Sequence, residues 1–388
     1  MRESAAERHE RLLGLVRDRG SARVSDLAAL LGVSPVTARR DVELLAGEGR
    51  LDRIHGSVSW PGRRPAAAPG AGSVADGGHG PVIGLLAPSS TYYFAEVIRG
   101  AHEAAARAGS RLILRISDYR PEEDPVRTEG LLAAGAEGLL IAPGWRAPGD
   151  PAAHGEWITG LPVPAVLLER RAAPGSALDG MDRVASDHGH GALLAVRHLR
   201  DLGHGAPLLV ARSDSPTALA VRSGYTDALG ALGLRAPGPV IDSVPAEQRP
   251  EEFEAAVRAL HEAVVSGTAS AALVHNDVDA IQMVQRLAEL GVRVPDDLAL
   301  IAYDDEVAAL ADIPLTAVAP PKREVGREAT RLLVERLAGG PGDADEPRRH
   351  LALLPRLRVR DSCGARRAGD AGGGTGTHTR RVADGISS

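Results

Sequence analysis

The chain has 388 residues, of which 44% are hydrophobic and 25% are charged, a length and composition that suit a small module joined to a larger two-lobed globular body. It contains no apolar run of about 18 residues, and its charged N-terminal segment lacks the apolar core of a signal peptide, so we expect a cytoplasmic protein without membrane contact. The net charge of −6 does not indicate nucleic-acid binding by itself, and any such function has to rest on where the arginines lie.

The first 60 residues have the pattern of three short helices followed by a hairpin. Apolar residues at helical spacing predict a first helix over residues 5–19. Ser25 is a suitable N-cap for a second helix and Ser34 for a third, in which Pro35 takes the first position, where a missing N–H costs nothing. The buried stripe of the third helix is expected to consist of Ala38, Val42 and Leu45.

The third helix and the segment after it carry the polar residues that are expected to meet DNA. The major groove admits one helix, whose outward side chains reach base edges and phosphates. Residues 50–60 predict a two-stranded wing that adds contacts to the DNA backbone. A helical bundle that contacts another protein, with its arginines solvated, is the alternative. The expected DNA-binding residues are Ser34, Pro35, Thr37, Arg39, Arg40, Arg50, Arg53 and His55.

Two segments have the composition of flexible chain. Residues 61–80 are rich in Pro, Gly and Ala and predict a linker, and residues 364–388 are of low complexity and predict a disordered tail. The only cysteine, Cys363, has no second thiol with which to form an internal disulfide, which fits a reducing compartment. We therefore expect a DNA-binding domain over residues 1–60 and a separate domain over residues 81–361.

Beyond the linker, short apolar runs alternate with helical patterns. Near-continuous apolar strands of this kind indicate parallel sheets covered by helices on both faces, and the length of the region suggests two lobes. The predicted class is α/β, and ligands in such folds bind beyond the carboxyl ends of the strands. The predicted strands cover residues 82–87, 112–116, 138–142, 165–169, 207–211, 271–275 and 298–303. The predicted helices cover residues 95–108, 126–134, 189–202, 217–232, 250–266, 278–290 and 322–338.

Two parts of the chain resemble known families. The segment SPVTARRDVELLAGEGRLDRIHG resembles the DeoR-type winged helix-turn-helix, in a likeness that covers residues 8–58. Residues 81–361 resemble the LacI/GalR sensor domain and the periplasmic sugar-binding fold, in segments such as IGLLAPSSTYYFAEVIRGAHEAAARAG and ALVHNDVDAIQMVQRLAELGVRVPDDLALIAYDDE. The resemblance implies an N-terminal winged helix-turn-helix and a two-lobed periplasmic-binding-protein-like domain with parallel sheets.

The second resemblance implies a ligand between the two lobes. Tyr93 and Phe94 fall where aromatic rings stack on the ligand in the family, and Glu169 and Arg170 replace the family's Asp-Arg pair after a strand. An amide, a carboxylate and an Arg that converge in a dry cleft suit hydroxyl groups. The implied ligand-binding residues are Tyr93, Phe94, Glu169, Arg170, Arg222, Asn276 and Asp304.

Three positions depart from the family. Thr91 stands where sugar-binding relatives often carry Asn, and Pro320 stands where a polar Gln is frequent. Val221 occupies the place at which the family's ligand-binding Arg usually lies, and Arg222 follows it by one residue. These departures favour a pocket that is less polar than a pentose or hexose site.

Together these features predict a DNA-binding transcriptional regulator whose operator binding is controlled by a small metabolite, a sugar or sugar derivative. Operator symmetry and the resemblance favour a homodimer on double-stranded DNA. No cofactor is expected, because no GxGxxG follows the first strand and no Walker loop is present. No metal site is expected either, because the spacing of His188, His190, His198 and His204 does not place three of them on one helix face.

Two alternatives remain at this stage. One is an α/β enzyme that processes a sugar or nucleotide, with the N-terminal module as a protein-interaction domain. The only hints of acid–base chemistry for such an enzyme are Asp304-Asp305 and His275 near strand ends. The other is a protein that only buffers its ligand and does not bind DNA.

Overall fold

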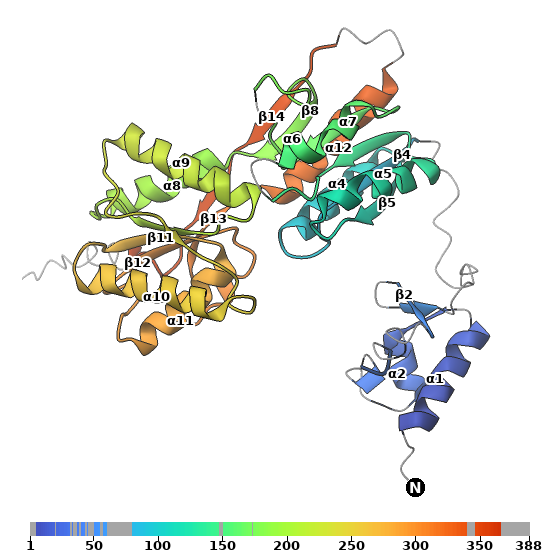
Figure 1. Cartoon of the computed structure of the whole chain (residues 1–388), viewed down its shortest axis with the longest axis horizontal. Coiled ribbons are helices and arrows are strands. Elements are labelled where there is room, and N and C mark those ends of the chain that lie inside the picture. Colours follow the sequence, from blue (N-terminus) through green and yellow to red (C-terminus); the bar gives the residue numbers. More distant parts are fainter. Residues whose placement is uncertain are drawn as a thin grey trace, which may run out of the picture. The chain divides into compact units, whose positions relative to one another are not determined.

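The computed structural model describes residues 5–19, 21–31, 33, 37–38, 40–42, 45, 50–54, 57–59, 80–146, 150–172, 174–339 and 346–365. The chain divides into two compact units, Met1–Asp76 and Gly77–Ser388, and each is described by itself (Figure 1). Most of the predicted linker and tail lies outside the described residues, as do four predicted DNA-binding residues, namely Ser34, Pro35, Arg39 and His55. None of the helices in the described ranges has the length and apolar character needed to cross a bilayer.

The N-terminal unit combines helices with a small antiparallel sheet. Its elements are α1 (Ala5–Arg19), β1 (Ser21–Arg23), α2 (Val24–Leu31), β2 (Asp52–Ile54) and β3 (Ser57–Ser59), and residues 37–38, 40–42 and 45 are also helical. β3 lies between β1 and β2 and pairs antiparallel with both. The predicted two-stranded wing therefore gains a third strand, which sequence reasoning missed because Ser-Ala-Arg has no apolar alternation.

An apolar core holds the helix that contains Thr37 and Arg40. The predicted stripe of Ala38, Val42 and Leu45 is confirmed, since each is at most 1% exposed. The buried cluster consists of Leu12, Leu13, Val16, Leu27, Leu31, Val42, Leu45 and Leu51. This packing leaves Arg40 exposed on the outer side of its helix.

The second unit consists of two α/β lobes. Lobe I contains β4 (Val82–Ala87), α4 (Tyr93–Arg107), β5 (Arg111–Ile116), α5 (Asp124–Ala133), β6 (Gly138–Ile141), α6 (Asp150–His154), α7 (Glu156–Thr159), β7 (Ala165–Leu168), β8 (Asp182–Ser186), α12 (Lys322–Ala338) and β14 (His350–Leu353). Lobe II contains α8 (His188–Asp201), β9 (Leu208–Ala211), α9 (Pro216–Leu232), β10 (Ile241–Asp242), α10 (Pro250–Val265), β11 (Ala271–His275), α11 (Asp277–Glu289), β12 (Ala299–Tyr303), β13 (Thr316–Ala319) and β15 (Arg356–Arg358).

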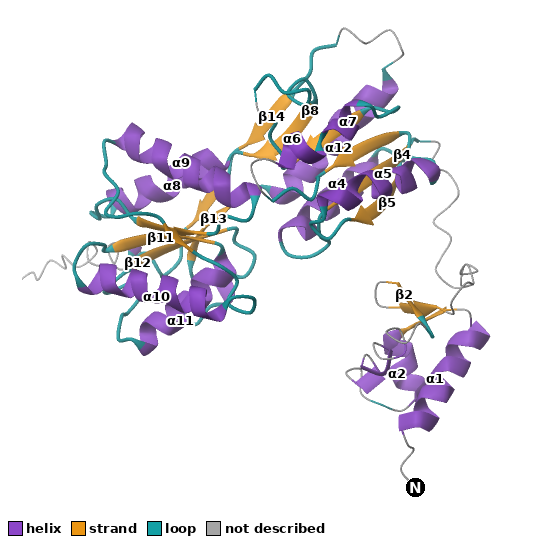
Figure 2. Cartoon of the chain, in the orientation of Figure 1, coloured by secondary structure: helices purple, strands orange, loops and turns teal. Residues whose placement is uncertain are grey.

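Each lobe is built on a six-stranded, mainly parallel sheet between helices (Figure 2). The strand order is β14-β8-β7-β6-β4-β5 in lobe I and β10-β9-β11-β12-β13-β15 in lobe II, where only the β13–β15 pair is antiparallel. β6, β9, β11 and β12 are buried along their whole length, as expected for strands covered on both faces. The predicted α/β class with two parallel lobes is confirmed.

The chain passes between the lobes in three short connections. The first runs from the end of β8 at Ser186 to the start of α8 at His188. The second joins β13, which ends at Ala319, to α12, which begins at Lys322. The third joins β14, which ends at Leu353, to β15, which begins at Arg356. Residues at these connections, His188 and Lys322 in particular, therefore lie where any change in lobe spacing has to be absorbed.

Two glycines set the distance between α4 and α12 in lobe I. A Cβ on Gly100 would lie 1.9 Å from the carbonyl oxygen of Arg323, and one on Gly326 would lie 2.0 Å from that of Val97. Only glycine permits backbones to approach this closely. The close packing brings Tyr93, at the start of α4, beside Lys322, at the start of α12, with the Lys322 Nζ 5.2 Å from the ring centroid.

Candidate functional site

A cavity of about 180 Å³ lies between the lobes, far more than the ~10–15 Å³ that one water molecule needs. Its walls come from segments that follow the carboxyl ends of β4, β5, β6 and β7 in lobe I and β9, β10, β11 and β12 in lobe II. This is where parallel α/β folds bind ligands. The lining residues are Tyr92, Tyr93, Phe94, Tyr119, Arg146, Glu169, Arg170, Arg212, Asp214, Ser215, Pro216, Thr217, Pro245, Gln248, His275, Asn276 and Asp304.

Six of the seven candidate ligand-binding residues lie in this cavity, and lobe I supplies four of them. Tyr93 donates from its hydroxyl to Glu169 Oε1 at 2.8 Å, and the Arg170 guanidinium lies over the Phe94 ring at 5.6 Å. Arg170 also donates from Nε to the Pro143 carbonyl at 2.9 Å. These contacts fix two aromatic rings and one cation against the wall of lobe I.

Lobe II supplies an amide and a carboxylate. The Asn276 Oδ1 accepts from the Asp279 backbone N–H at 3.1 Å and caps α11, which leaves the amide NH₂ to donate elsewhere. Asp304 Oδ1 has no hydrogen-bond partner among the described residues, although the residue is only 3% exposed. Burial raises the pKa of Asp304 to about 6, against the lowering effect of Lys322. A buried carboxylate oxygen without a partner is costly unless a ligand supplies a donor.

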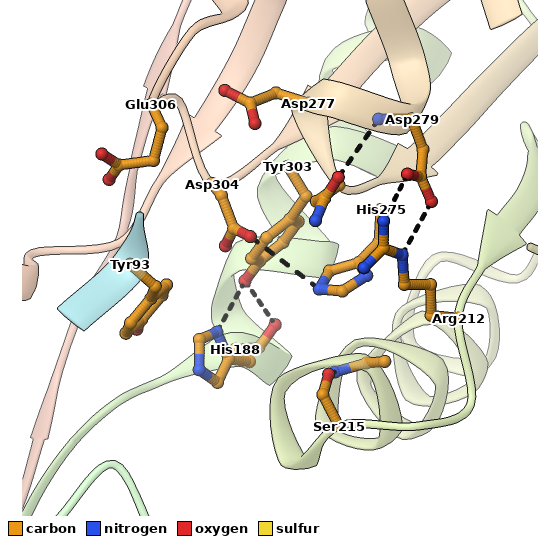
Figure 3. A network of polar contacts seen from close by, with 12 residues as sticks. Tyr93, His188, Arg212, Ser215, His275, Asp277, Asp279, Tyr303, Asp304 and Glu306 are labelled. Carbon is orange, nitrogen blue, oxygen red and sulfur yellow. Dashed lines mark hydrogen bonds and ion pairs between the residues drawn. The ribbon is translucent and has the colours of Figure 1, made fainter. Parts of the chain in front are cut away.

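Two buried histidines, His188 and His275, lie near the carboxylates of Glu169 and Asp304, and Figure 3 shows both histidines with Asp304. His188 Nε2 lies 3.8 Å from Glu169 Oε2, and His275 Nε2 lies 4.0 Å from Asp304 Oδ2. Tyr303 lies between the two imidazole rings and shares a 3.1 Å hydrogen bond with His188 Nδ1. Burial lowers the pKa of His188 to about 3 and that of His275 to about 4, so both rings are neutral near pH 7.

Arg222, the seventh candidate, does not line the cavity. Its guanidinium donates to the backbone carbonyls of Ala211 and Arg212 and pairs with Asp242 at 2.5 Å, which turns it toward the β9–β10 edge. Arg212 lines the cavity instead, held by two hydrogen bonds to Asp279 at 2.9 and 2.6 Å. Arg212 directly follows a predicted strand, so the rule that ligands bind beyond strand ends was sufficient to find it.

Sequence reasoning also missed a contact between the lobes. Tyr92 of lobe I donates from its hydroxyl to Asp277 Oδ1 at 2.5 Å and lies 3.3 Å from Asp304 Oδ2, both in lobe II. The neighbouring Tyr93 was identified by resemblance, but no sequence pattern distinguishes the two tyrosines. Tyr92 therefore joins the lobes at the edge of the cavity.

Several lining residues have a backbone conformation that side chains rarely adopt. The φ angle is +50° at Tyr92, +56° at Tyr119, +50° at Glu169 and +91° at Asp304. Such conformations outside glycine cost free energy and gather at ligand sites, where the surrounding structure maintains them. Here each one directs a side chain from a strand end into the wall of one cavity.

In the N-terminal unit, the helix around Thr37 and Arg40 is anchored by a buried acid. Asp41 accepts from Arg8 Nε at 2.6 Å and lies 2.9 Å from His9 Nε2, both on α1. Burial opposes ionisation, but these two partners outweigh it and lower the pKa of Asp41. The anchoring fixes the rotation of the helix and hence the side on which Arg40 is exposed.

The side chains of the other described candidates for DNA contact are less clearly free to reach DNA than that of Arg40. Arg50 is exposed but pairs with Glu10 of α1 at 2.7 Å, and Arg53 lies in β2. Thr37 is half-buried within its helix. Among the residues that the structure describes, no group of three His, Cys, Asp or Glu side chains is arranged to hold a metal ion.

Comparison with known proteins identifies both units. Residues 8–63 match the DeoR-like helix-turn-helix domain, and residues 196–363 match the periplasmic binding protein-like domain. The transcriptional repressor PurR of Vibrio atlanticus is 26% identical over 353 residues, which span 88% of this chain and 98% of that protein.

Solved structures give the same result for the larger unit. A LacI-family transcriptional regulator from Sanguibacter keddieii is 27% identical with a TM-score of 0.56, over 74% of this chain and all of that one. The Escherichia coli transcriptional repressor ascG is 27% identical with a TM-score of 0.57, over 73% and 98% of the two chains. The relatives are transcription factors, so the enzyme alternative is wrong. The chain therefore combines a DeoR-like helix-turn-helix domain with a periplasmic binding protein-like domain, and over most of its length it is similar to helix-turn-helix transcriptional regulators of the LacI type.

Proposed function

We propose that this regulator senses a small hydroxylated metabolite, a sugar or sugar derivative, in the cavity between lobes I and II. The observation that carries the proposal is the buried Asp304 Oδ1, which has no partner in the described part of the chain and lies in the same cavity as the Asn276 amide and the Arg212 guanidinium. One acceptor and two donors converge there, a set that suits hydroxyl groups, since a hydroxyl both donates and accepts. Tyr93 and Phe94 offer ring surface to the apolar face of such a ligand.

The ligand acts by favouring one spacing of the lobes. It contacts lining residues of both lobes, in a cavity that Tyr92 already bridges through Asp277. A ligand shifts the equilibrium between two arrangements only by its difference in affinity for them. An effector that binds one arrangement of the lobes better therefore changes the affinity of the protein for DNA. Bound DNA changes the affinity of the protein for the effector by the same free energy.

DNA binding is assigned to a domain over residues 1–60, joined through residues 61–80 to the sensor over residues 81–361, in a cytoplasmic homodimer on a symmetric operator. The helix anchored by Asp41 carries the groove contacts, and the β2–β3 hairpin carries contacts to the DNA backbone. The residues proposed to contact DNA are Ser34, Pro35, Thr37, Arg39, Arg40, Arg50, Arg53 and His55.

The DNA part is tested by fluorescence anisotropy with DNA from upstream of the protein's own gene, over a series of salt concentrations. We expect tight binding that weakens steeply with salt, because phosphate contacts release counterions. The Arg39→Ala/Arg40→Ala double variant should lose the preference over random DNA, whereas Arg258→Ala in the sensor should retain it. Equal binding of the operator fragment by the double variant and the wild type would refute the assignment of the helix.

The effector part is tested by adding a panel of sugars and sugar phosphates to the protein–DNA complex. We expect one of them to change the DNA affinity, and Asp304→Asn to weaken that effect about tenfold or more, since a hydrogen bond to a charged group is lost. Asp227→Asn, an exposed carboxylate on α9, is the matched control and should leave the effect unchanged. An effector response that survives in Asp304→Asn would place the ligand elsewhere.

A further inference from the structure

A second cavity of about 190 Å³ lies in the same cleft, behind one wall of the first. The two cavities share four residues, Glu169 and Arg170 of lobe I and Pro216 and Thr217 of lobe II. The second is lined in addition by Trp145, Arg171, Ala185, Ser186, His188, Leu219 and Ala220. Because both lobes contribute, anything bound in it also affects the lobe spacing.

The lining of the second cavity is more apolar than that of the first. Trp145 follows β6 and Ala185 lies on β8 in lobe I, while Leu219 and Ala220 lie on the first turns of α9 in lobe II. The cavity has no equivalent of the Asn276 and Asp304 pair that faces the first. A small space with such walls favours a compact apolar group over a second polyhydroxylated ring.

Two donors at this cavity have no hydrogen-bond acceptor in the described part of the chain. They are Trp145 Nε1 and Arg170 Nη2. The other Arg170 nitrogens already donate, Nε to the Pro143 carbonyl at 2.9 Å and Nη1 to the Glu169 carbonyl at 3.0 Å. Buried donors of this kind are expensive unless a ligand provides an acceptor.

The Glu169 carboxylate and one His188 nitrogen at the cavity already have hydrogen-bond partners. Both Glu169 carboxylate oxygens accept hydrogen bonds from Ser186, and His188 shares its Nδ1 with Tyr303. Arg170 and Arg171 provide two positive charges against the single negative charge of Glu169, although Arg171 is exposed and lies 3.9 Å from Asp187. The site therefore favours a ligand group that accepts hydrogen bonds and carries negative charge.

We propose that the second cavity is a subsite for a small aromatic or branched aliphatic group that bears a carboxylate, held by Trp145 and Arg170. The inference rests on the proposed function, because it uses the same cleft as the effector. The group is either part of an effector that spans both cavities or a separate small molecule, and the chemistry required of it is the same.

The test uses full-length protein and 4-fluorobenzoate as the probe, observed by ¹⁹F NMR line broadening, with fluorobenzene as the analogue without a carboxylate. We expect 4-fluorobenzoate to bind more tightly than fluorobenzene. Ala220→Leu should weaken its binding by about tenfold or more, because the added side chain fills the cavity. Ala231→Leu makes the same change at an exposed position of α9 and should bind as the wild type does.

Trp145→Phe keeps an aromatic wall and removes one donor, so it should weaken 4-fluorobenzoate by roughly two- to tenfold and leave fluorobenzene nearly unchanged. Binding of 4-fluorobenzoate that is equal in Ala220→Leu and wild type would overturn the inference, as would the absence of binding by a protein that still responds to a sugar on DNA. A protein that binds 4-fluorobenzoate but responds to no sugar would leave the subsite intact and count against the proposed effector class. Displacement of the probe by the effector would indicate one ligand that spans both cavities, and joint binding would indicate two.

Discussion

Two buried carboxylates line the first cavity from opposite lobes, and they differ in what surrounds them. Both Glu169 and Asp304 follow parallel strands, have a positive φ and lie near a neutral histidine. Glu169 is saturated with hydrogen bonds, since its carboxylate oxygens accept from the Tyr93 hydroxyl and from both the backbone N–H and the hydroxyl of Ser186. Asp304 keeps Oδ1 unpartnered within the described structure.

The difference suggests a division of work between the lobes. A saturated carboxylate stabilises the fold and has little capacity left for a ligand, whereas an unsaturated one destabilises the empty site and gains from a ligand. Lobe I then provides a fixed wall, and the polar recognition of the effector lies mainly in lobe II. Each of the following experiments tests that asymmetry.

The largest expected effect is a loss of stability in acid to which the histidine beside Glu169 contributes. Burial lowers the pKa of His188 from 6.5 to about 3, so the unfolded chain binds more protons between these values. The free energy of unfolding should therefore fall as the pH falls from about 6.5 toward 3, by on the order of 4 kcal/mol from this residue. His188→Gln should flatten the dependence, as measured by urea unfolding at several pH values.

The histidine beside Asp304 should contribute a smaller pH dependence. Burial lowers the pKa of His275 to about 4, which favours the fold as the pH rises from 4 to 6.5. Burial raises the pKa values of both Asp304 and Glu169, so each histidine has a carboxylate beside it whose contribution has the opposite sign. A histidine variant removes only the contribution of the histidine itself, and the pKa of His275 is lowered less than that of His188. His275→Gln should therefore change the slope less than His188→Gln does, and the reverse order would contradict this difference between the two histidines.

The next prediction compares the replacement of a carboxylate by an amide at Glu169 and at Asp304. Glu169→Gln replaces an acceptor by a donor opposite Ser186 and should lower the free energy of unfolding by about 2 kcal/mol, because a buried donor is left unpaired. Asp304→Asn removes a buried charge without breaking a saturated network and should cost less than about 1 kcal/mol. Urea unfolding of the two variants at pH 7 measures the difference, and equal losses would refute the division of work.

The parts of the fold that the sequence predicted are those with a strong local signal. Six of the buried parallel strands, β4, β6, β7, β9, β11 and β12, are apolar runs bounded by turns, and the prediction found each within a residue or two. β8 (DRVAS) escaped because it opens on two charged residues, and β14 (HLAL), at the edge of the sheet, is only four residues long, so neither gives a clear apolar run. The two-residue β10 is too short to give any pattern.

The residues of the candidate site also fall into those that the sequence predicted and those that it did not. Resemblance and the strand-end rule brought Tyr93, Glu169 and Asp304 together, since their places depend on strand order alone. Arg222 failed because the direction of a long side chain depends on competing partners, here two backbone carbonyls and Asp242. The Tyr92 contact depends on lobe spacing, which no local pattern encodes.

A smaller effect is the pH dependence of effector binding. If Asp304 accepts hydrogen bonds from the effector, only its ionised form binds well, and its pKa of about 6 falls within the accessible range. The affinity should be constant above pH 7 and decline toward roughly tenfold per pH unit below 6. Isothermal titration calorimetry between pH 5 and 8 measures it, and Asp304→Asn should abolish the dependence. An affinity that rises in acid would assign recognition to a protonated group instead.

The smallest expected effect concerns Lys322, the only lysine of the chain, which lies at a connection between the lobes. Its ammonium donates to the Asp304 carbonyl and to Glu306 and lies over the Tyr93 ring, so it contacts both sides of the cleft without lining the cavity. Its charge lowers the pKa of Asp304 against the dominant effect of burial.

Lys322→Met retains most of the buried side-chain volume and removes that charge. The pKa of Asp304 should rise, and the midpoint of the pH profile of effector affinity should move upward by less than about one unit. Arg323→Met, the neighbouring residue on α12 that pairs with Glu103 away from the cavity, is the matched control and should leave the midpoint in place. An unchanged midpoint in Lys322→Met, together with an effector affinity that falls equally at every pH, would mean that the lysine only holds the lobes together. In that case the electrostatic difference between the two carboxylates would depend on burial alone.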